Sequence, residues 1–228
     1  MRDTHSVTRD SNKELVLQEL SILQDIGDTS GECRAHGNLG AVHLSLGNNT
    51  LALRCFQEQL ERARELKDAA GEAQAFGNMG ITRMNLSHFE EAIGNFESQL
   101  KSLEKGEGAA GSVRERARVL GNLGDCYSVL GQLQQSVRCH EQFLAMALQS
   151  RSVRDQDRAY RGLGTSHRNL GNLQDALVCF EKRLVISHDL SDPAATAAAY
   201  GELGDIHRLL GHFEQSVSCM ERRMEMAR

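Results

Sequence analysis

Residues 121–125 read Gly-Asn-Leu-Gly-Asp, and close relatives of this stretch recur along the chain. We call the last glycine of each copy the marker glycine; the five are Gly40, Gly80, Gly124, Gly164 and Gly204, at spacings of 40, 44, 40 and 40 residues. A fixed period in this range is typical of helical repeats, each of which buries its apolar face only by stacking on its neighbours. The sequence therefore predicts a repeat array whose function lies on an extended surface rather than in one catalytic pocket.

Each repeat carries the signals of two helices, which we call helix A and helix B. Helix A is predicted to start after a side chain that can accept hydrogen bonds from free N–H groups, at Asp28, Asp68, Ser112, Ser152 and Asp192. Pro193 fits a first helical turn, and Ser112 with Glu115 makes a capping box. Helix A is predicted to end about 18 residues later, where a left-handed residue can stop it, at Gly47, Ser87, Gly131, Gly171 and Gly211.

Helix B shows apolar residues on one helical face, which predicts the core. The face is clearest in three repeats, with Ala52, Leu53 and Phe56, then Ala92, Ile93 and Phe96, then Ala176, Leu177 and Phe180. The third and fifth repeats are looser, with Ser136, Val137 and His140, then Ser216, Val217 and Met220. All five continue with an apolar residue four positions on, at Leu60, Leu100, Leu144, Leu184 and Met224.

These signals predict an all-α array of antiparallel helix pairs with about 11 helices in total. Residues 1–28 hold a polar N-terminus and helix B of a truncated repeat, and the repeats are predicted at 29–68, 69–112, 113–152, 153–192 and 193–228. The second includes a glycine-rich loop, 106–111, which explains the 44-residue step. The fifth is expected to be truncated because no polar capping helix follows it, so we expect the chain to be a piece of a longer array.

Composition narrows the function classes. The chain has 228 residues, 40% of them hydrophobic and 25% charged, with a formal net charge of −5 and a pI near 6.0. No overall positive field would hold nucleic acid or an anionic membrane. The polar N-terminus lacks a signal-peptide core, and no apolar run reaches the roughly 18 residues that a membrane span needs. A cytoplasmic location is therefore expected, with neither nucleic acid nor membrane as a partner.

The cysteines predict neither disulfides nor a metal site. Cys55, Cys139, Cys179 and Cys219 share one repeat position, and packed helices lie about 8 to 10 Å apart, beyond the roughly 7 Å that a disulfide tolerates. We interpret them as buried small hydrophobic residues, and no CxxC pair indicates zinc. Neighbouring side chains on a helix diverge, so Cys139 and His140 do not make a nucleophile and base. No cofactor, metal or catalytic residue is expected, and the chain is predicted not to be an enzyme.

The pattern of Leu-Gly in helix A, a small residue twelve positions on and an aromatic residue at sixteen resembles the tetratricopeptide repeat, whose usual period is 34. With its longer period, this chain resembles the branch that contains the LGN spindle-orientation scaffold and a large CHAT-domain scaffold of mitosis and the midbody; the matching segments are 37–48, 121–131 and 176–190. The resemblance implies a right-handed α-solenoid and a protein-binding scaffold of cell division, at the spindle, centrosome or midbody. HEAT repeats share the period, but the Leu-Gly pattern favours the tetratricopeptide reading.

The resemblance also implies that the A helices line an inner wall on which side chains bind an extended peptide. Asn38, Asn78 and Asn122 form one row there, an asparagine ladder whose amides could bond peptide backbone. The other predicted contacts are arginines, which would favour an acidic or phosphorylated segment, at Arg34, Arg118, Arg158, Arg161, Arg168 and Arg208. The alternative is structural: the asparagines would bond one repeat to the next, and the arginines would be solvated or paired.

Two further functions stay open beside the scaffold. The array could be the regulatory or sensor arm of a larger CHAT-domain protein, or an LGN-like adaptor in polarity and G-protein signalling. The uncapped C-terminal helix could also recruit a second copy of the chain. His43, His167 and His207 share one repeat position and are interpreted as structural rather than as a pH switch.

Overall fold

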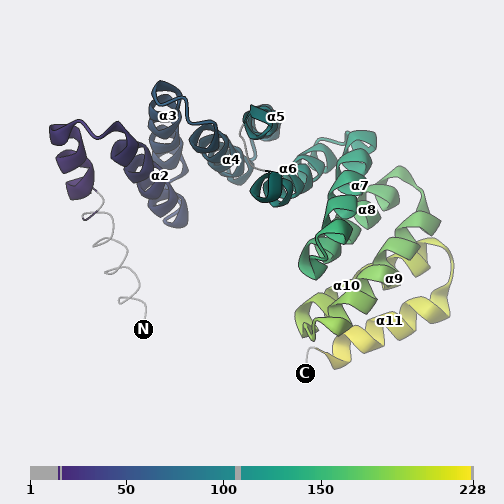
Figure 1. The fold of residues 1–228 in the computed structure, drawn as a ribbon. Coiled ribbons are helices and arrows are strands. Elements are labelled where there is room, and N and C mark those ends of the chain that lie inside the picture. Colours follow the sequence, from purple (N-terminus) through teal and green to yellow (C-terminus); the bar gives the residue numbers. More distant parts are fainter. Residues whose placement is uncertain (1–14, 16, 106–108, 227–228) are drawn as a thin grey trace, which may run out of the picture. The chain divides into compact units, whose positions relative to one another are not determined.

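The computed structural model describes residues 15, 17–105 and 109–226, with the backbone alone at 109–112, and every element in that part is an α-helix (Figure 1). The A helices are α2 (Thr29–Ser45), α4 (Ala69–Asn85), α6 (Ala109–Val129), α8 (Val153–Leu170) and α10 (Pro193–Leu209). The B helices are α3 (Asn49–Glu65), α5 (Phe89–Lys105), α7 (Leu133–Gln149), α9 (Leu173–Asp189) and α11 (Phe213–Glu225). Residues 17–26 are also helical, so the predicted all-α chain of about 11 helices is confirmed.

The helices form two compact units, residues 1–109 and 110–228, which we call unit 1 and unit 2. In unit 1, α3 packs between α2 and α4, and α4 also packs against α5. In unit 2, each helix from α8 to α11 packs on the one before it, and Ser136 of α7 donates a hydrogen bond to the Gly124 carbonyl of α6. Short connections reverse the chain between consecutive helices, so that neighbours within a unit run antiparallel (Figure 1). Each unit is therefore a stack of helix pairs, as the solenoid prediction requires.

Helix A ends where the sequence predicted. Gly47 follows α2 with φ of +77°, Asn48 donates its backbone N–H to the His43 carbonyl, and Gly47 donates to the Leu44 carbonyl. This pair of bonds is the Schellman arrangement that closes a helix C-terminus. Ser87, although not a glycine, adopts φ of +60° at the equivalent position of α4. The left-handed backbone conformation thus belongs to the repeat position, and it is adopted there by serine as well as by glycine.

Most helix starts also agree with the sequence. The carboxylates of Asp28, Asp68 and Asp192 accept hydrogen bonds from first-turn N–H groups of α2, α4 and α10. Ser152 precedes α8 but bonds the Asp155 carboxylate instead of a backbone N–H. The predicted start at Ser112 is wrong, because α6 begins at Ala109 and Ser112 lies inside it. The glycine-rich loop is correspondingly shorter than predicted, and its residues 106–108 lie outside the described part of the chain.

The marker glycines let helix A touch helix B of its own repeat. A Cβ atom added to Gly80 would lie 2.5 Å from the Phe96 ring, and one added to Gly164 would lie 2.6 Å from the Phe180 ring. Both rings are fully buried, as is Phe56 in the first repeat. The predicted core face of helix B is therefore confirmed in the first, second and fourth repeats, and the recurring Leu-Gly has a steric cause: only glycine leaves room for the ring.

The core face is only partly buried in α11, where Ser216 is buried and Met220 is half-buried against Gly204 of α10. Val217 is 57% exposed and Met224 61% exposed, whereas Leu177, which matches Val217 in α9, is buried beneath α10. In the described chain no helix lies on the other side of α11 in the place that α10 takes on α9. The cysteine prediction needs a similar correction: all six thiols are free, but of the four that share a position only Cys179 is buried and the others are half-buried.

Candidate peptide-binding surface

The candidate site is the solvent-facing side of the A helices, which we call the A-helix face. In unit 1, Arg34 and Asn38 are exposed on α2, and Gln74 and the half-buried Asn78 take the equivalent positions on α4. The side-chain amides of Asn38 and Asn78 make no hydrogen bond within the described part of the chain. Two amides at matching positions on successive A helices are therefore available to a ligand in unit 1.

Gln59 supports this surface from beneath. Its side chain is buried on α3 against Gly37, and its amide nitrogen donates a 3.3 Å hydrogen bond to the Gln74 side-chain oxygen on α4. A residue on helix B thus links to the A-helix face of the following repeat. The contact holds the Gln74 side chain in place one helical turn before Asn78.

The third asparagine is already occupied. Arg158 on α8 donates from Nη2 to the Asn122 side-chain oxygen at 2.7 Å and to the Asp125 carboxylate at 2.6 Å, both on α6. Its guanidinium also lies 5.7 Å from the centre of the Phe143 ring, close enough for a cation–π contact. Asn122 therefore bonds one repeat to the next, whereas Asn38 and Asn78 do not.

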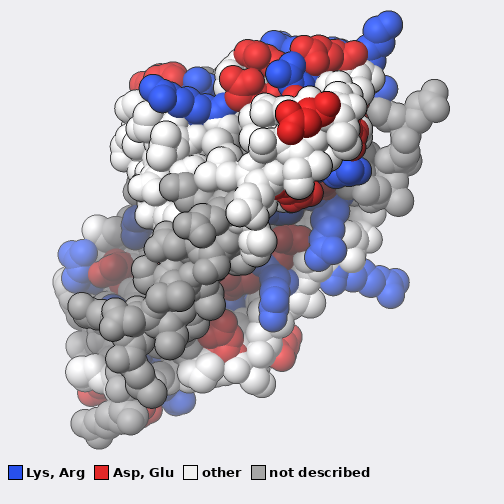
Figure 2. Space-filling view, turned by 90° about the vertical axis from the view of Figure 1, so that its left-hand side faces the viewer, with Lys and Arg blue, Asp and Glu red and all other residues white. Residues whose placement is uncertain are grey.

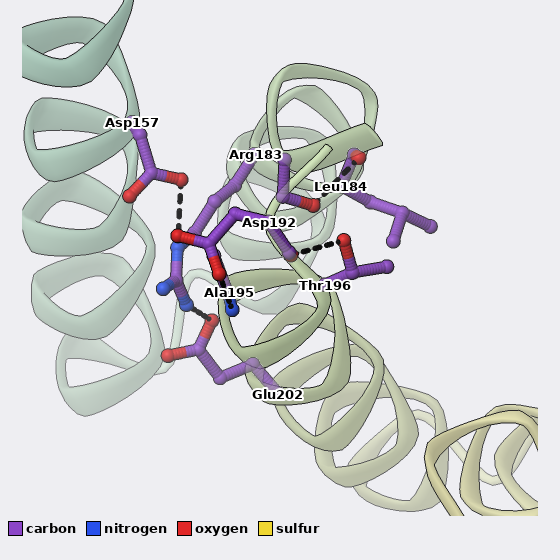
Figure 3. A network of polar contacts seen from close by, with 8 residues as sticks. Asp157, Arg183, Leu184, Asp192, Ala195, Thr196 and Glu202 are labelled. Carbon is purple, nitrogen blue, oxygen red and sulfur yellow. Dashed lines mark hydrogen bonds and ion pairs between the residues drawn. The ribbon is translucent and has the colours of Figure 1, made fainter. Parts of the chain in front are cut away.

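A second network of polar contacts joins α8, α9 and α10 and includes the residue at the asparagine position of the last repeat (Figure 3). Arg183 on α9, only 5% exposed, extends between Asp157 on α8 and Glu202 on α10 and forms an ion pair with each. Glu202 stands at the position of the asparagine row. Burial raises the pKa of Glu202, while Arg183 and the nearby Arg161 and Arg168 act in the opposite direction. A buried arginine between two carboxylates is a structural ion-pair cluster, in which each charge needs the others.

The remaining predicted arginines stay on the surface of unit 2. Arg118, Arg161 and Arg208 are exposed, Arg168 is half-buried, and none of them has an ion pair within the described residues. Arg161 and Arg168 lie close enough to Glu202 for their charges to act on its carboxyl group. The structure thus separates the six predicted arginines into one that is held by internal contacts, Arg158, and five whose guanidinium groups have no ion pair or hydrogen bond within the described residues.

The core below Asn122 is unusually polar. His140 takes the place of the phenylalanine under the marker glycine, lies between Gly124 and Gly162, and is fully buried with no hydrogen bond at either ring nitrogen. Its Nε2 atom is 3.7 Å from the Asp125 carboxylate. Burial lowers the pKa of His140 to about 4, with smaller opposing and reinforcing effects from Asp125 and from Arg158 and Arg161. His140 is therefore a neutral core residue at physiological pH.

Charges of both signs are mixed on the face of the molecule shown in Figure 2, with no single-sign field. None of the helices in the described part is both long enough and apolar enough to cross a membrane.

Burial raises the pKa of the Cys126 thiol to about 12 and that of Cys179 to about 11, which makes both poor nucleophiles. Among the described residues no group of three or more His, Cys, Asp or Glu side chains is placed to hold a metal ion.

Arg183 and Asp125 were not predicted from the sequence as partners in these networks. A signal was present in four of the five repeats: the position nineteen residues after the marker glycine carries a polar side chain at Gln59, Gln99, Arg183 and Arg223, whereas the third repeat has Phe143 there. In the structure this position faces the third residue before the marker, where glycine provides room for it at Gly37, Gly77 and Gly201. Polar side chains at this position therefore indicate internal links between helices, as Gln59 and Arg183 make, although the residue three before the marker glycine is Arg161 rather than glycine in the repeat of Arg183.

A comparison with known families agrees with the repeat fold. The features that indicate this fold are the helix pairing, the close contact at the marker glycine and the left-handed turns. The family model of the tetratricopeptide repeat matches residues 31–105, 115–184 and 155–228. The chain belongs to the tetratricopeptide repeat family. No curated protein matches this tetratricopeptide repeat protein in sequence.

Solved structures with the same fold have low sequence identity to this tetratricopeptide repeat protein. BtubC (BKLC) from P. vanneervenii is 16% identical, with a TM-score of 0.82 over 96% of this chain and 91% of its own. MamA from Desulfovibrio magneticus RS-1 is 18% identical, with a TM-score of 0.68 over 86% and 94%. Aspartyl phosphate phosphatase F from Bacillus subtilis is 15% identical, with a TM-score of 0.77 over 91% and 54%. These similarities establish the fold.

Proposed function

We propose that this protein is a non-enzymatic scaffold that binds extended segments of partner proteins along its A-helix face. The observation that supports the proposal most directly is the pair of unbonded amides of Asn38 and Asn78 on successive A helices. A side-chain amide offers two donors and an acceptor, which matches the alternating N–H and C=O groups of an extended backbone. Unit 1 is therefore the proposed reader of peptide backbone.

Unit 2 is proposed to supply charge recognition instead. Its matching positions are taken by internal contacts, since Arg158 holds Asn122 and Arg183 holds Glu202. The guanidinium groups of Arg118, Arg161, Arg168 and Arg208 have no ion pair with any described residue, and the planar arginine fork suits carboxylate and phosphate groups. Segments that bind unit 1 are accordingly proposed to be neutral, and segments that bind unit 2 are proposed to be acidic or phosphorylated.

A display selection of proteome-derived peptides on the purified chain tests the proposal. The variant Asn38→Ala with Asn78→Ala is expected to lose roughly thirtyfold in affinity, because each of the two lost amide bonds contributes about 1 kcal/mol. Asn85→Ala, which changes an exposed asparagine at the end of α4, is the matched control and should bind as the parent does. Unchanged binding by the double variant, with helicity and melting also unchanged, would show that the asparagines do not contact the ligand.

The biological setting is proposed from the resemblance of residues 37–48, 121–131 and 176–190 to tetratricopeptide repeat protein 28 and to the LGN-type branch. On that basis the scaffold acts in cell division, in the cytoplasm and at the spindle, centrosome or midbody. Imaging the tagged chain through mitosis tests this directly. Uniform cytoplasmic signal at every stage would reject the cell-division role and leave the peptide-binding role to be judged on its own experiment.

A further inference from the structure

Unit 2 carries further arginines on its A helices beside those that were predicted as peptide contacts. Arg114 and Arg118 on α6 stand ten and six residues before their marker glycine, and Arg154 and Arg158 take the same two positions on α8. Arg114, Arg118 and Arg154 are exposed and have no ion pair within the described residues. Arg161 extends the row on α8, since positions i, i+4 and i+7 share one face of a helix. These five residues form what we call the arginine cluster.

One member of the cluster differs from the rest. Arg158 is 31% exposed on its side chain, rests over the Phe143 ring and already holds the Asp125 carboxylate at 2.6 Å. Its Nε and Nη1 groups donate to no described residue, so its bonding capacity is only partly used. Asp125 thus takes the place that an acidic group of a ligand would take on the most rigidly held arginine of the cluster.

Resting on the proposed function, we propose that Asp125 is a built-in competitor that makes the arginine cluster select phosphorylated segments over segments rich in glutamate. A ligand carboxylate that replaced Asp125 on Arg158 would exchange one carboxylate for another, against a competitor that is held in place by the fold. A ligand carboxylate that left Asp125 in place would meet an arginine whose charge is already compensated.

A phosphate group escapes this competition. It carries close to two negative charges near neutral pH and three acceptor oxygens. It can therefore accept from the unused N–H groups of Arg158 and also bond a neighbour on the same face of α8, Arg154 or Arg161, without Asp125 having to leave. Asp125 therefore lowers the affinity of the arginine cluster for a carboxylate much more than its affinity for a phosphate. This difference in affinity is the selectivity.

The test compares two fluorescent Gly-Ser peptides of similar total charge, one with three phosphoserines and one with six glutamates. Fluorescence anisotropy is measured on the parent chain, on Asp125→Asn and on Asp205→Asn. Asp205 occupies the same repeat position on α10 and has no ion pair in the described region, so its variant removes an equal charge without freeing an arginine. Circular dichroism and melting of each variant verify folding.

The parent is expected to bind the phosphopeptide about tenfold more tightly than the glutamate peptide. Asp125→Asn should strengthen glutamate binding about tenfold and change phosphopeptide binding much less, while Asp205→Asn should leave the preference unaltered. Equal binding of both peptides by the parent, with no change in Asp125→Asn, overturns the selectivity and leaves acidic recognition standing. Binding of neither peptide by the parent or by Asp125→Asn overturns both the selectivity and the proposed acid recognition of unit 2.

Discussion

Gly80 and Phe96 illustrate how a single hydrogen atom sets the spacing between two helices. The glycine has no side chain, and the space that a Cβ atom would take is filled by a fully buried ring. The ring can bury its whole surface only because helix A approaches this closely. Removal of a large apolar side chain and addition of a small one at such a contact are both costly in a closely packed core.

We expect Gly80→Ala to lower the free energy of unfolding by about 2 kcal/mol, since the new methyl group would force the Phe96 ring or helix α4 to move. Gly94→Ala is the matched control: Gly94 lies in α5 with open space where its Cβ would be. That variant should gain about 0.5–1 kcal/mol, because alanine is the better helix former. Urea unfolding of the two variants measures both changes, and equal shifts in one direction would contradict the steric explanation.

His140 makes the stability of unit 2 depend on pH. In the folded chain burial lowers its pKa to about 4 from the ordinary 6.5, so between these values the unfolded chain binds a proton that the folded chain does not. Stability is therefore complete above pH 6.5 and decreases as the pH falls towards 4, by about 2 kcal/mol at pH 5.

The variant His140→Phe restores the residue that three other repeats carry at this position. We expect it to be more stable than the parent at pH 5 and to lose much less stability between pH 7.5 and pH 5, as measured by urea midpoints at the two values. The groups that face His140, Asp125, Arg158 and Arg161, are unchanged in this variant. A parallel loss in both proteins would show that other groups cause the acid sensitivity.

Single residues also show what could not be predicted from the sequence. Asn38, Asn78 and Asn122 are identical in type and position, yet among the described residues only the side chain of Asn122 is bonded, and its partner Arg158 lies 36 residues further on in the next repeat. A glutamine, Gln74, takes the position of Arg158 one repeat after Asn38, and it is bonded to Gln59 instead. Local pattern identifies the row, but three-dimensional packing determines which members are free.

At the scale of the helix, the turns were predictable because their chemistry is local. Gly47, Gly131, Gly171 and Gly211 all adopt positive φ after helix A, as the sequence indicated. The start of α6 was not predictable in the same way. Ser112 has the right side chain for an N-cap, but Ala109 and Ala110 before it are strong helix formers, and the helix extends back through them. Helix propensity prevailed over capping at this position.

Ser87 provides a test of the turn. We expect Ser87→Gly to stabilise the chain by about 1 kcal/mol, because Ser87 holds φ of +60° and glycine adopts that conformation without steric strain. The reverse change at the equivalent position, Gly131→Ser with φ of +72°, should destabilise by a similar amount. Thermal melting of the two variants should move in opposite directions, and a loss in both would mean that the Ser87 side chain makes a stabilising contact of its own.

At the scale of the whole molecule, an apolar surface on α11 is exposed in the described part of the chain. Phe213, Val217 and Met224 lie on one face of α11, and all three are well exposed. The same face of α9 is covered by α10, which shows how such a surface is normally satisfied inside this array. An exposed apolar surface of this kind favours association.

The predicted self-association through α11 can be measured by sedimentation over a range of concentrations. We expect the parent chain to associate as concentration rises and Val217→Glu with Met224→Glu to remain monomeric, because two buried charges would oppose the contact. The control is Val178→Glu with Val185→Glu, which changes two exposed valines on α9, 47% and 59% exposed. A parent that is monomeric throughout, or a control that dissociates as well, would reject α11 as the contact.

The link from Arg158 back to α6 also has a consequence for how arrays of this kind change in length. Excision of residues 153–192 would join Ser152 to Pro193 at equivalent points, with helix A following in its usual place. Ala198 would then stand where Arg158 now stands, and Asn122 and Asp125 would lose their donor. Loss or duplication of one repeat in a gene would therefore preserve the architecture while changing which amides and carboxylates are exposed to a partner.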